Sequence, residues 1–340
     1  MSLLDRKLLL GAARGGGLDV STLYSGDPYV GNGTSKKITT GTDLSGKGGI
    51  ILLKRRDGGG HSYLIDSGSA FANYLTTSAA GSITDNQTML TGVHSDGFTL
   101  DYLWTANTNY SGQSHMSWSF CKSPGFLDIV DYVGNGQSYT SIGHNLGSEP
   151  GFILIKCMTN TDPWYVGFRD ASGWHHGQLN NMTSLTFASD TMGVAFPDTQ
   201  FNVNRMAPQP LASTANKSGL YYRAYLFAHD PTPNGVIQCG SYIGNGQGVG
   251  PTIDLGWKPQ FVMYRAANVG GSNWNVVDLA RHTATPSSWS SGQLLNSTSS
   301  EQLVGTINPL VNGFRPLSPT TDVNASGIKY FYMAIRAEGA

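Results

Sequence analysis

The pentapeptide Tyr-(Val/Ile)-Gly-Asn-Gly occurs three times in the chain, at residues 29–33, 132–136 and 242–246. The copies begin 103 and 110 residues apart, and 99 residues remain from the start of the third copy to residue 340. Solenoid and propeller repeats span only about 20–50 residues, so this long period predicts that each repeat is a domain with its own core. A phosphate-binding loop would be closed by Lys-Ser/Thr ahead of a helix, and none of the copies has that ending. We therefore interpret the motif as a domain-start signature, in which Tyr ends a strand and Gly-Asn-Gly forms a tight hairpin turn with positive φ.

Further landmarks follow each copy in one order. An apolar run ends in a cation at Lys54, Lys156 or Arg265, which predicts a strand buried on both faces whose cation marks where it reaches water. A returning hairpin strand, a polar stretch, a Gly-Phe or Gly-Val step and a closing strand come next. The Gly-Phe and Gly-Val steps and the closing strands lie at residues 97–98, 193–194 and 313–314, and at residues 115–122, 222–229 and 330–337.

These landmarks predict an all-β chain of three tandem antiparallel β-sandwich repeats, jelly-roll-like and about 100 residues long, preceded by a short N-terminal helix. The expected domains are an N-terminal helix and Gly-rich linker at residues 1–28, then repeats at residues 29–131, 132–241 and 242–340. In the head, Leu3, Leu4, Leu8, Leu9 and Leu10 suit an amphipathic helix. A lone helix this short is marginal in water, so its leucines either dock on the first domain or anchor the chain in a partner protein.

Composition excludes several classes of partner. Charged residues make up 13% of the chain and the net charge is −1, so no electrostatic field attracts nucleic acid. We expect no membrane insertion and no secretory signal peptide, because the sequence lacks the long apolar runs that either requires. Cys121, Cys157 and Cys239 are odd in number and irregularly placed, which indicates small buried hydrophobes rather than a disulfide framework or metal ligands.

Candidate chemistry is sparse, and we expect no catalytic residue, no metal site and no cofactor. Asp66 and Asp278 hold matching places after the second strand of their repeats and are interpreted as turn or capping carboxylates, with Asp170 the nearest counterpart. His175 and His176 would point to opposite faces of a strand, so we favour a surface loop over a metal site. Trp104, Trp174 and Trp289 stand in polar surroundings, and with His175 they are the candidates for surface contact with a sugar or protein.

The order of these motifs resembles repeated β domains in virion proteins of marine tailed bacteriophages, including cyanophages. The stretches SFCKSPGFLDIVDYVGNG (119–136) and LGSEPGFILIK (146–156) carry the resemblance most clearly, together with the opening LLDRKLLLGAARGGG. It covers residues 3–156 well and the remainder loosely, because the third repeat has KPQFVMYR in the equivalent place. The resemblance implies a structural tail or tail-fibre-like component and brings no catalytic residues.

Three functional hypotheses follow, in order of preference. The first is a non-enzymatic virion protein of the tail or tail fibre, made in the host cytoplasm, attached through its N-terminus to other virion proteins and able to contact a host surface glycan or protein. A homotrimer would suit a fibre, whereas a monomer seated by its N-terminus would suit the second hypothesis, a capsid decoration protein. The third is a polysaccharide depolymerase, which would require a carboxylate pair in a cleft.

Overall fold

The protein is nearly all β. The computed structural model describes residues 17–81, 83–85, 89–101, 108–137, 139–180, 185–187, 198–203 and 215–340. Strands make up 48% and helices 4%, and the sheets are antiparallel, so the predicted all-β class is confirmed. The helical elements described are single turns: η1 (Val20–Thr22), α2 (Leu44–Lys47) and η2 (Ser67–Ser69). The predicted N-terminal helix, with its five leucines, lies outside the described residues.

Three larger sheets follow one another along the chain, and we call the residues they span unit 1 (24–121), unit 2 (127–228) and unit 3 (237–336). In sheet order, unit 1 contains β1 (Tyr24–Val30), β9 (Ser114–Cys121), β3 (Gly49–Arg55), β4 (Tyr63–Asp66), β5 (Asn73–Thr76) and β6 (Thr84–Asp85). Unit 2 contains β10 (Leu127–Val133), β17 (Tyr221–Ala228), β12 (Pro150–Cys157), β13 (Tyr165–Asp170), β14 (Gly173–Gln178) and β15 (Thr186–Phe187). Unit 3 begins with β18 (Ile237–Ile243), β25 (Lys329–Arg336), β20 (Pro259–Ala266), β21 (Asn275–Asp278) and β22 (Trp289–Leu294).

The leading strands have the same order in each unit. The first strand lies at the edge, the closing strand pairs with it, and the apolar strand and its hairpin partner follow. Each motif tyrosine (Tyr29, Tyr132 or Tyr242) is the sixth residue of a seven-residue edge strand. The domain boundaries drawn from the sequence at these tyrosines therefore cut through β1, β10 and β18, because the motif marks the end of the entering strand rather than its beginning.

A smaller group of strands accompanies the larger sheet in units 1 and 2, and in unit 3 the corresponding strands continue the larger sheet from β22, which gives a sheet of eight strands. These strands are β2 (Lys36–Thr39), β8 (Gly97–Leu100) and β7 (Leu90–His94) in unit 1, β11 (Thr140–Gly143) and β16 (Gln200–Val203) in unit 2, and β23 (Gln302–Leu310), β24 (Gly313–Pro316) and β19 (Ile253–Asp254) in unit 3. In all three an isoleucine pairs with a fully buried phenylalanine: Ile38 with Phe98, Ile142 with Phe201 and Ile253 with Phe314. In unit 2 this register position is occupied by Phe201, while the predicted step at residues 193–194 lies outside the described residues.

The YxGNG motif closes a clasp between two loops instead of a hairpin turn. The strand before each motif pairs with the closing strand of its unit, so the prediction of a tight hairpin is wrong. The motif asparagine exchanges hydrogen bonds with a second asparagine far along the chain, in the sequence Asn-x-Ser-Gly at residues 109–112, 216–219 and 324–327. Each motif tyrosine donates its hydroxyl to the backbone carbonyl just before that second asparagine: Tyr29 to Thr108 at 2.6 Å, Tyr132 to Ala215 at 2.6 Å and Tyr242 to Val323 at 2.7 Å.

The two glycines of the motif have different roles in this clasp. The last glycine has the predicted positive φ, at 69° for Gly33, 71° for Gly136 and 68° for Gly246. The first glycine lies directly against the partner loop: a Cβ on Gly134 would stand 2.2 Å from the carbonyl oxygen of Lys217. Only glycine permits the two backbones to approach this closely.

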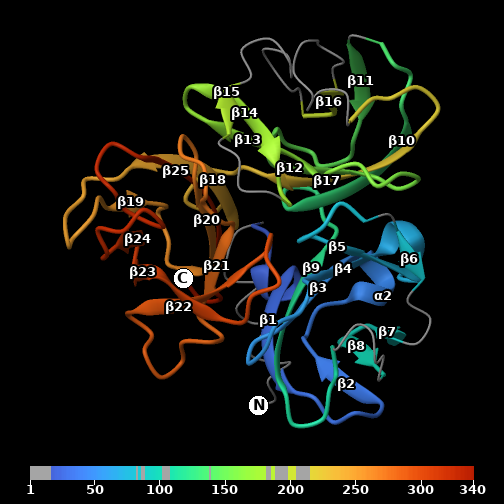
Figure 1. Cartoon of the computed structure of the whole chain (residues 1–340), viewed down its shortest axis with the longest axis horizontal. Helices are drawn as coiled ribbons and strands as arrows, with labels where there is room; N and C mark the ends of the chain where they lie inside the picture. Colours follow the sequence, from blue (N-terminus) through green and yellow to red (C-terminus); the bar gives the residue numbers. More distant parts are fainter. Residues whose placement is uncertain are drawn as a thin grey trace.

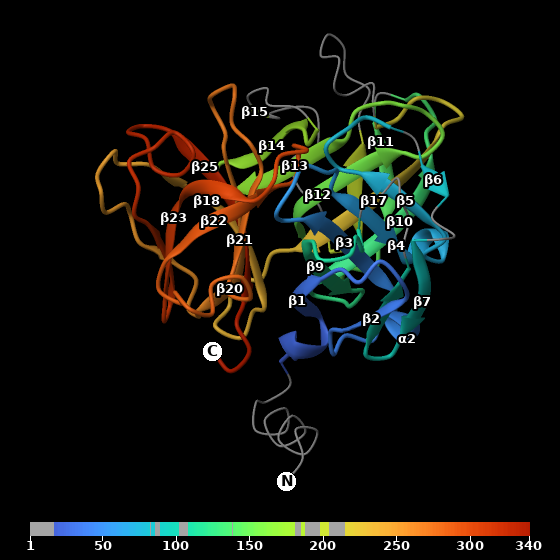
Figure 2. The ribbon, with the colours of Figure 1, turned by 60° about the horizontal axis from the view of Figure 1, so that its bottom comes forward.

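The three units are arranged around one centre (Figures 1 and 2), where apolar side chains from all three meet. Alternate residues of each apolar strand face opposite sides of its sheet. In β3, Ile51 and Leu53 join the core under the smaller sheet of unit 1, whereas Ile50 and Leu52 join a core to which all three units contribute. At that centre, the Phe120 ring lies 5.7 Å from Phe227 and 6.0 Å from Phe261.

The cations that end the apolar strands are buried. Lys54 is 1% exposed, and Lys156 and Arg265 are 0% exposed, so the prediction that they mark emergence into water is wrong. Each instead donates across a junction to a backbone carbonyl of another unit: Lys54 Nζ to Ser297 at 2.6 Å, Lys156 Nζ to Ala80 at 3.4 Å and Arg265 Nη1 to Gln178 at 3.3 Å. Unit 1 thus reaches unit 3, unit 2 reaches unit 1 and unit 3 reaches unit 2. Burial lowers the pKa of both lysines to about 8.

A buried carboxylate forms a reciprocal contact at each junction. The predicted capping role of Asp66 and Asp278 is confirmed, since they accept from the backbone N–H of Ser69 and Arg281. Both, and Asp170, also bind side chains of a neighbouring unit: Asp66 accepts from Arg223 Nη1 and the Tyr225 hydroxyl at 2.7 Å each, Asp278 from Trp118 Nε1 at 3.0 Å, and Asp170 from Ser241 Oγ and Lys329 Nζ at 2.9 Å each. The three units therefore close into a ring locked by polar contacts.

Replacement of Gly134 by alanine tests the clasp. We expect Gly134→Ala to lower the free energy of unfolding by about 2–3 kcal/mol, because the new Cβ would force the two backbones apart. The matched control is Gly248→Ala, where a Cβ would meet nothing within 4 Å; it should change stability by less than about 0.5 kcal/mol. Urea unfolding followed by tryptophan fluorescence measures both, and equal midpoints would contradict the clasp.

Replacement of Arg223 by methionine tests the polar lock between units 1 and 2. The variant leaves the carboxylate of Asp66 buried without its cation, so we expect a loss of about 3–5 kcal/mol in the free energy of unfolding. Arg315→Met is the control, since Arg315 donates its hydrogen bonds to the hydroxyl of the exposed Thr252 on its own unit. A stability loss for Arg223→Met no larger than that for Arg315→Met would show that the lock is energetically neutral.

Candidate functional site

The described surface-contact candidates from the sequence are buried. Trp174 and His175 lie on β14 at 5% and 7% exposure, and Trp289 lies on β22 at 0%, so the expectation that they form an exposed platform is wrong. The polar residues next to these tryptophans in the sequence suggested exposure. That inference fails in a strand, because adjacent residues face opposite sides of the sheet. Trp104 and the five leucines of the head lie outside the described residues.

His175 belongs to a polar cluster with Asp170 and Ser172. Its Nε2 lies 3.2 Å from Asp170 Oδ1 and 3.3 Å from Ser172 Oγ, and Ser172 Oγ donates to the same Asp170 oxygen at 2.5 Å. In a hydrolytic triad the carboxylate and the serine bind opposite nitrogens of the imidazole. Here both approach the same nitrogen and the serine hydroxyl is directed at the carboxylate, so the cluster orients Asp170 rather than activating a nucleophile.

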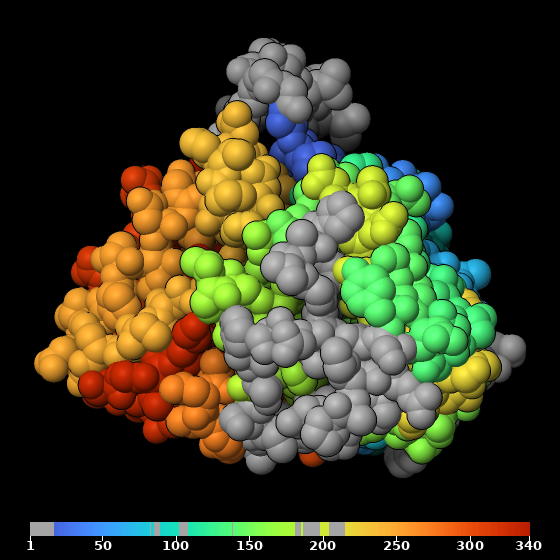
Figure 3. Space-filling view, turned by 90° about the horizontal axis from the view of Figure 1, so that it is seen from above, coloured from blue at the N-terminus to red at the C-terminus, as the bar shows by residue number. Residues whose placement is uncertain are grey.

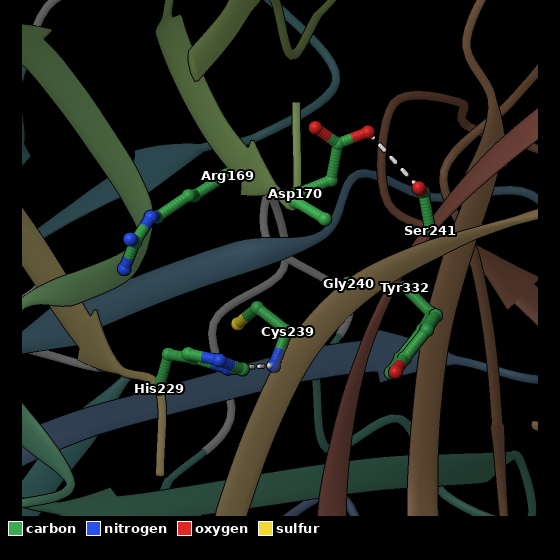
Figure 4. Close-up of a pocket in the computed structure, with 8 residues that line it drawn as sticks. Arg169, Asp170, His229, Cys239, Gly240, Ser241 and Tyr332 are labelled. Carbon is green, nitrogen blue, oxygen red and sulfur yellow. Dashed lines mark hydrogen bonds between the residues drawn. The ribbon is translucent and has the colours of Figure 1, made fainter. Parts of the chain in front are cut away.

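Asp170 of this cluster also lines a pocket at the junction of units 2 and 3, which we call the seam pocket. In the view from above, unit 2 (green) and unit 3 (orange and red) lie directly against each other (Figure 3). The pocket has a volume of about 320 Å³ and is lined by residues 169–171 at the end of β13, His229 after β17, residues 239–241 of β18, and Tyr332 of β25. Figure 4 shows Asp170 of unit 2 facing Ser241 of unit 3, with His229 beside Cys239.

The titratable groups of the seam pocket are poorly suited to nucleophilic catalysis. Burial raises the pKa of the Cys239 thiol well above its ordinary value, so the thiol stays protonated at neutral pH. Burial, reinforced by the nearby Arg169 guanidinium, lowers the pKa of His229 and keeps its imidazole neutral. His229 Nδ1 accepts from the backbone N–H of Cys239 at 3.2 Å, as Figure 4 shows, so this histidine does not bind the thiol through that nitrogen.

Asp170 stays ionised over the whole physiological range. Burial raises the pKa of its carboxyl group, but hydrogen bonds from His175, Ser172 and Lys329 outweigh burial and hold the pKa far below its usual range. A carboxylate held in this way is a strong hydrogen-bond acceptor and a poor proton donor. It can position Ser241, whose hydroxyl it binds, and it is not suited to general acid chemistry.

A second depression lies at the junction of units 1 and 3. It is lined by residues that include Arg56, Asp57, Glu301 and Leu303, and its volume is about 430 Å³. Arg56 Nε donates to Glu301 Oε2 at 2.5 Å, which ties the two units together at this point. Burial raises the pKa of Glu301, yet Arg56 and Arg281 outweigh it and hold the carboxyl group ionised. This depression is therefore built around a structural ion pair.

Among the residues that the structure describes, no group of three or more His, Cys, Asp or Glu is arranged to hold a metal ion. No described helix has the length and apolar character needed to cross a membrane. The three cysteines are free and buried, as the sequence predicted.

Sequence reasoning missed the seam pocket and the clasp partners. The clasp partners had a readable signal, because Thr-Asn-Tyr-Ser-Gly, Ala-Asn-Lys-Ser-Gly and Val-Asn-Ala-Ser-Gly recur at residues 108–112, 215–219 and 323–327. The pocket had none, since its residues belong to two units and come together only when the units pack. The position of Asp170 was recognised, but its contacts with Ser241 and Lys329 were not.

Comparison with known proteins gives one result. The family described as Domain of unknown function (DUF7483) matches residues 19–339. The chain belongs to this family. The DUF7483 match begins just before β1 and ends just after β25, so one family description spans all three units. No curated protein and no solved structure gave a significant match.

The pH dependence of stability tests the role of Asp170. Its pKa is lower in the folded chain than the ordinary 3.8, so its contribution to stability is complete above about pH 5 and is lost as the pH falls below that ordinary value. We expect Asp170→Asn to cost about 2 kcal/mol at pH 7 and to unfold with a shallower dependence on pH below 5.

Urea midpoints between pH 3 and pH 7 measure this effect. Asp198→Asn, a change of an exposed aspartate in the same unit, is the control and should follow the unaltered protein. If the difference between Asp170→Asn and the unaltered protein were the same at pH 3 and pH 7, the ionised carboxylate would not be the source of the stability.

Proposed function

We propose that this chain is a non-enzymatic bacteriophage virion structural protein of the tail-fibre or tail-associated type, built from three tandem β-sandwich repeats of about 100 residues. The repeated motifs supply the link to virion proteins through the resemblance described for residues 3–156. The common order of the leading strands and the three clasps support the repeat architecture. Membership of the DUF7483 family is compatible with the proposal and does not bear on function.

The observation that carries the proposal is the closed ring of buried polar contacts between the units. At each junction a buried cation of one unit donates to a backbone carbonyl of the other; these cations are Lys54, Lys156 and Arg265. A buried carboxylate of the second unit accepts from a side chain of the first; these carboxylates are Asp66, Asp170 and Asp278. Such contacts hold three units in one fixed arrangement, which is what a protein displayed on a particle requires. The carboxylates that line the two pockets at junctions, Asp170 and Glu301, take part in these contacts.

Equivalent exposed side chains give the ring three matching contact points. The residue after each motif tyrosine is aliphatic and exposed: Val30 at 55%, Val133 at 61% and Ile243 at 52%. Isolated exposed apolar residues are common, but these occupy one position in all three units, next to the clasp. Their recurrence supports protein contacts with other components of the particle.

The ring also favours one alternative, a capsid decoration protein. A fibre is commonly built as a homotrimer, in which the inner faces of three chains cover one another. Here the three inner faces already cover one another within a single chain, as the shared core around Phe120, Phe227 and Phe261 illustrates. A monomer seated on a particle through its N-terminus accords with this closed packing.

Location in the particle tests both versions of the proposal. We expect the protein to be present in purified particles by mass spectrometry, and a bound antibody fragment in a cryo-EM reconstruction to mark the tail in the first version and the head in the second. Deletion of residues 1–14 should abolish incorporation while leaving the remaining chain folded. Absence of the protein from purified infectious particles would overturn the proposal.

Sedimentation of the purified protein separates the two versions further. A monomer of 36.3 kDa is expected for the decoration role, and a trimer for the fibre role. A monomer found on the tail would support an adaptor within the tail-associated version.

A further inference from the structure

The three junctions of the ring are built alike but filled differently, and this asymmetry isolates the seam pocket. Strand register matches positions across the junctions, because β1, β10 and β18 pair with their closing strands in the same way. Residues 239–241 of unit 3 correspond to residues 129–131 of unit 2 and to residues 26–28 of unit 1. The side chains at these positions decide whether space remains between the units.

At the junction of units 1 and 2, an arginine takes up the space. Arg223 is 2% exposed, and its guanidinium binds Asp66 in unit 1 and Asp131 in unit 2 at 2.6–2.7 Å. A Cβ on Gly68 of unit 1 would stand only 2.4 Å from its Cζ, so the guanidinium lies directly against the neighbouring backbone.

At the junction of units 3 and 1, the side chains of Tyr24 and Met116 occupy the corresponding space. A Cβ on Gly26 would stand 3.0 Å from the Tyr24 hydroxyl and 3.1 Å from Met116 Cε. Tyr24 is 3% exposed and Met116 is fully buried, so both side chains are packed into this junction.

At the junction of units 2 and 3, Tyr332 covers Gly240, where a Cβ would stand 2.7 Å from the Tyr332 hydroxyl, but a pocket remains beside it. Cys239 and Gly240 stand where unit 2 has Ile129 and Val130, and Phe331 stands where unit 2 has Arg223. The Phe331 ring is engaged elsewhere, at 5.3 Å from Phe168. The result is the seam pocket of about 320 Å³, which lies at the lower end of the range of small-ligand sites.

The charges around the seam pocket cancel in pairs. Arg169 forms an ion pair with Glu149, and Asp170 forms one with Lys329 at 2.9 Å. His229 is neutral at pH 7 because burial and Arg169 lower its pKa. A charged ligand would enter without a counter-charge and would lose its hydration, which is costly.

Hydrogen-bonding groups nevertheless remain directed to the pocket. The Tyr332 side chain lines the pocket and ends in a hydroxyl group (Figure 4). Because His229 accepts through Nδ1, its neutral ring carries the proton on Nε2 and can donate it. Arg169 supplies further N–H donors, and the Tyr332 ring supplies an apolar wall.

We propose that the seam pocket binds one neutral sugar ring of a saccharide. Uncharged hydroxyl groups match a wall that offers several hydrogen bonds and no net charge, and a ring with one apolar face matches Tyr332. The inference deepens the proposed function, since a host surface glycan is the source of sugar that a virion protein would meet. Binding itself is a property of the purified chain and does not depend on its location in a particle.

Saturation-transfer NMR on the purified full-length protein tests the inference. The probes are glucose, galactose, mannose, rhamnose and N-acetylglucosamine, with glucuronate and glucosamine as charged analogues. We expect at least one neutral sugar to bind, and the charged analogues to bind at least about tenfold more weakly because they bury an unpaired charge.

Two variants assign that binding to the seam pocket. Tyr332→Phe should weaken the dissociation constant about fivefold through the lost hydroxyl contact, and Arg169→Met about tenfold. Tyr139→Phe is the matched control, because Tyr139 is 57% exposed and lies outside the pocket lining. Circular dichroism and urea midpoints establish that each variant is folded.

The outcomes separate this inference from the proposed function. No binding by any neutral sugar, equal binding of the charged analogues, or unchanged binding by both pocket variants would overturn the sugar site and leave the virion role standing. Sugar binding by a protein absent from particles would overturn the virion role and leave the sugar site standing.

Discussion

The structure depends on one constraint, which is that the central strand of each unit is apolar on both faces. In β3 and β12 almost every residue is buried, with one face under the smaller sheet of the unit and the other turned to the shared centre. A unit alone would leave its inner face in water, at a cost of roughly 25 cal/mol for each Å² of apolar surface left exposed. Closing three units into a ring covers all three inner faces at once. The ring therefore buries the inner faces of all three sheets in one shared core.

This packing explains why cations lie in the interior. Lys54, Lys156 and Arg265 leave the apolar strands at the edge of the shared core, where the neighbouring unit excludes water. A buried cation must find hydrogen-bond acceptors, and backbone carbonyls of the next unit supply them. Because each cation needs a carbonyl at one particular place, the contacts also fix how the units are oriented. Orientation is a stronger role for these residues than stabilisation, since buried charges are often close to neutral in net energy.

The three units repeat the same scaffold contacts, so a junction that differs from the other two is the place to look for a functional site. The clasps, the isoleucine–phenylalanine pairs and the cross-junction carboxylates recur with little change, which identifies them as parts of the scaffold. The seam pocket departs from the pattern, because Cys239 and Gly240 replace the larger Ile129 and Val130 of the preceding unit. A ring of equal units can thus carry one distinct site without loss of its common core.

The sequence by itself determined the strand content, the threefold recurrence and the capping role of Asp66 and Asp278, because turn chemistry and period-2 patterns are local properties of the chain. It also indicated that the three cysteines are buried hydrophobes. Only the tertiary structure decided which residues meet across the units. The burial of Lys54, Trp174 and Trp289 and the seam pocket all depend on contacts between residues tens to hundreds of positions apart. Such contacts leave no periodic trace in the sequence, since a strand presents the same pattern whether its outer neighbour is water or another sheet.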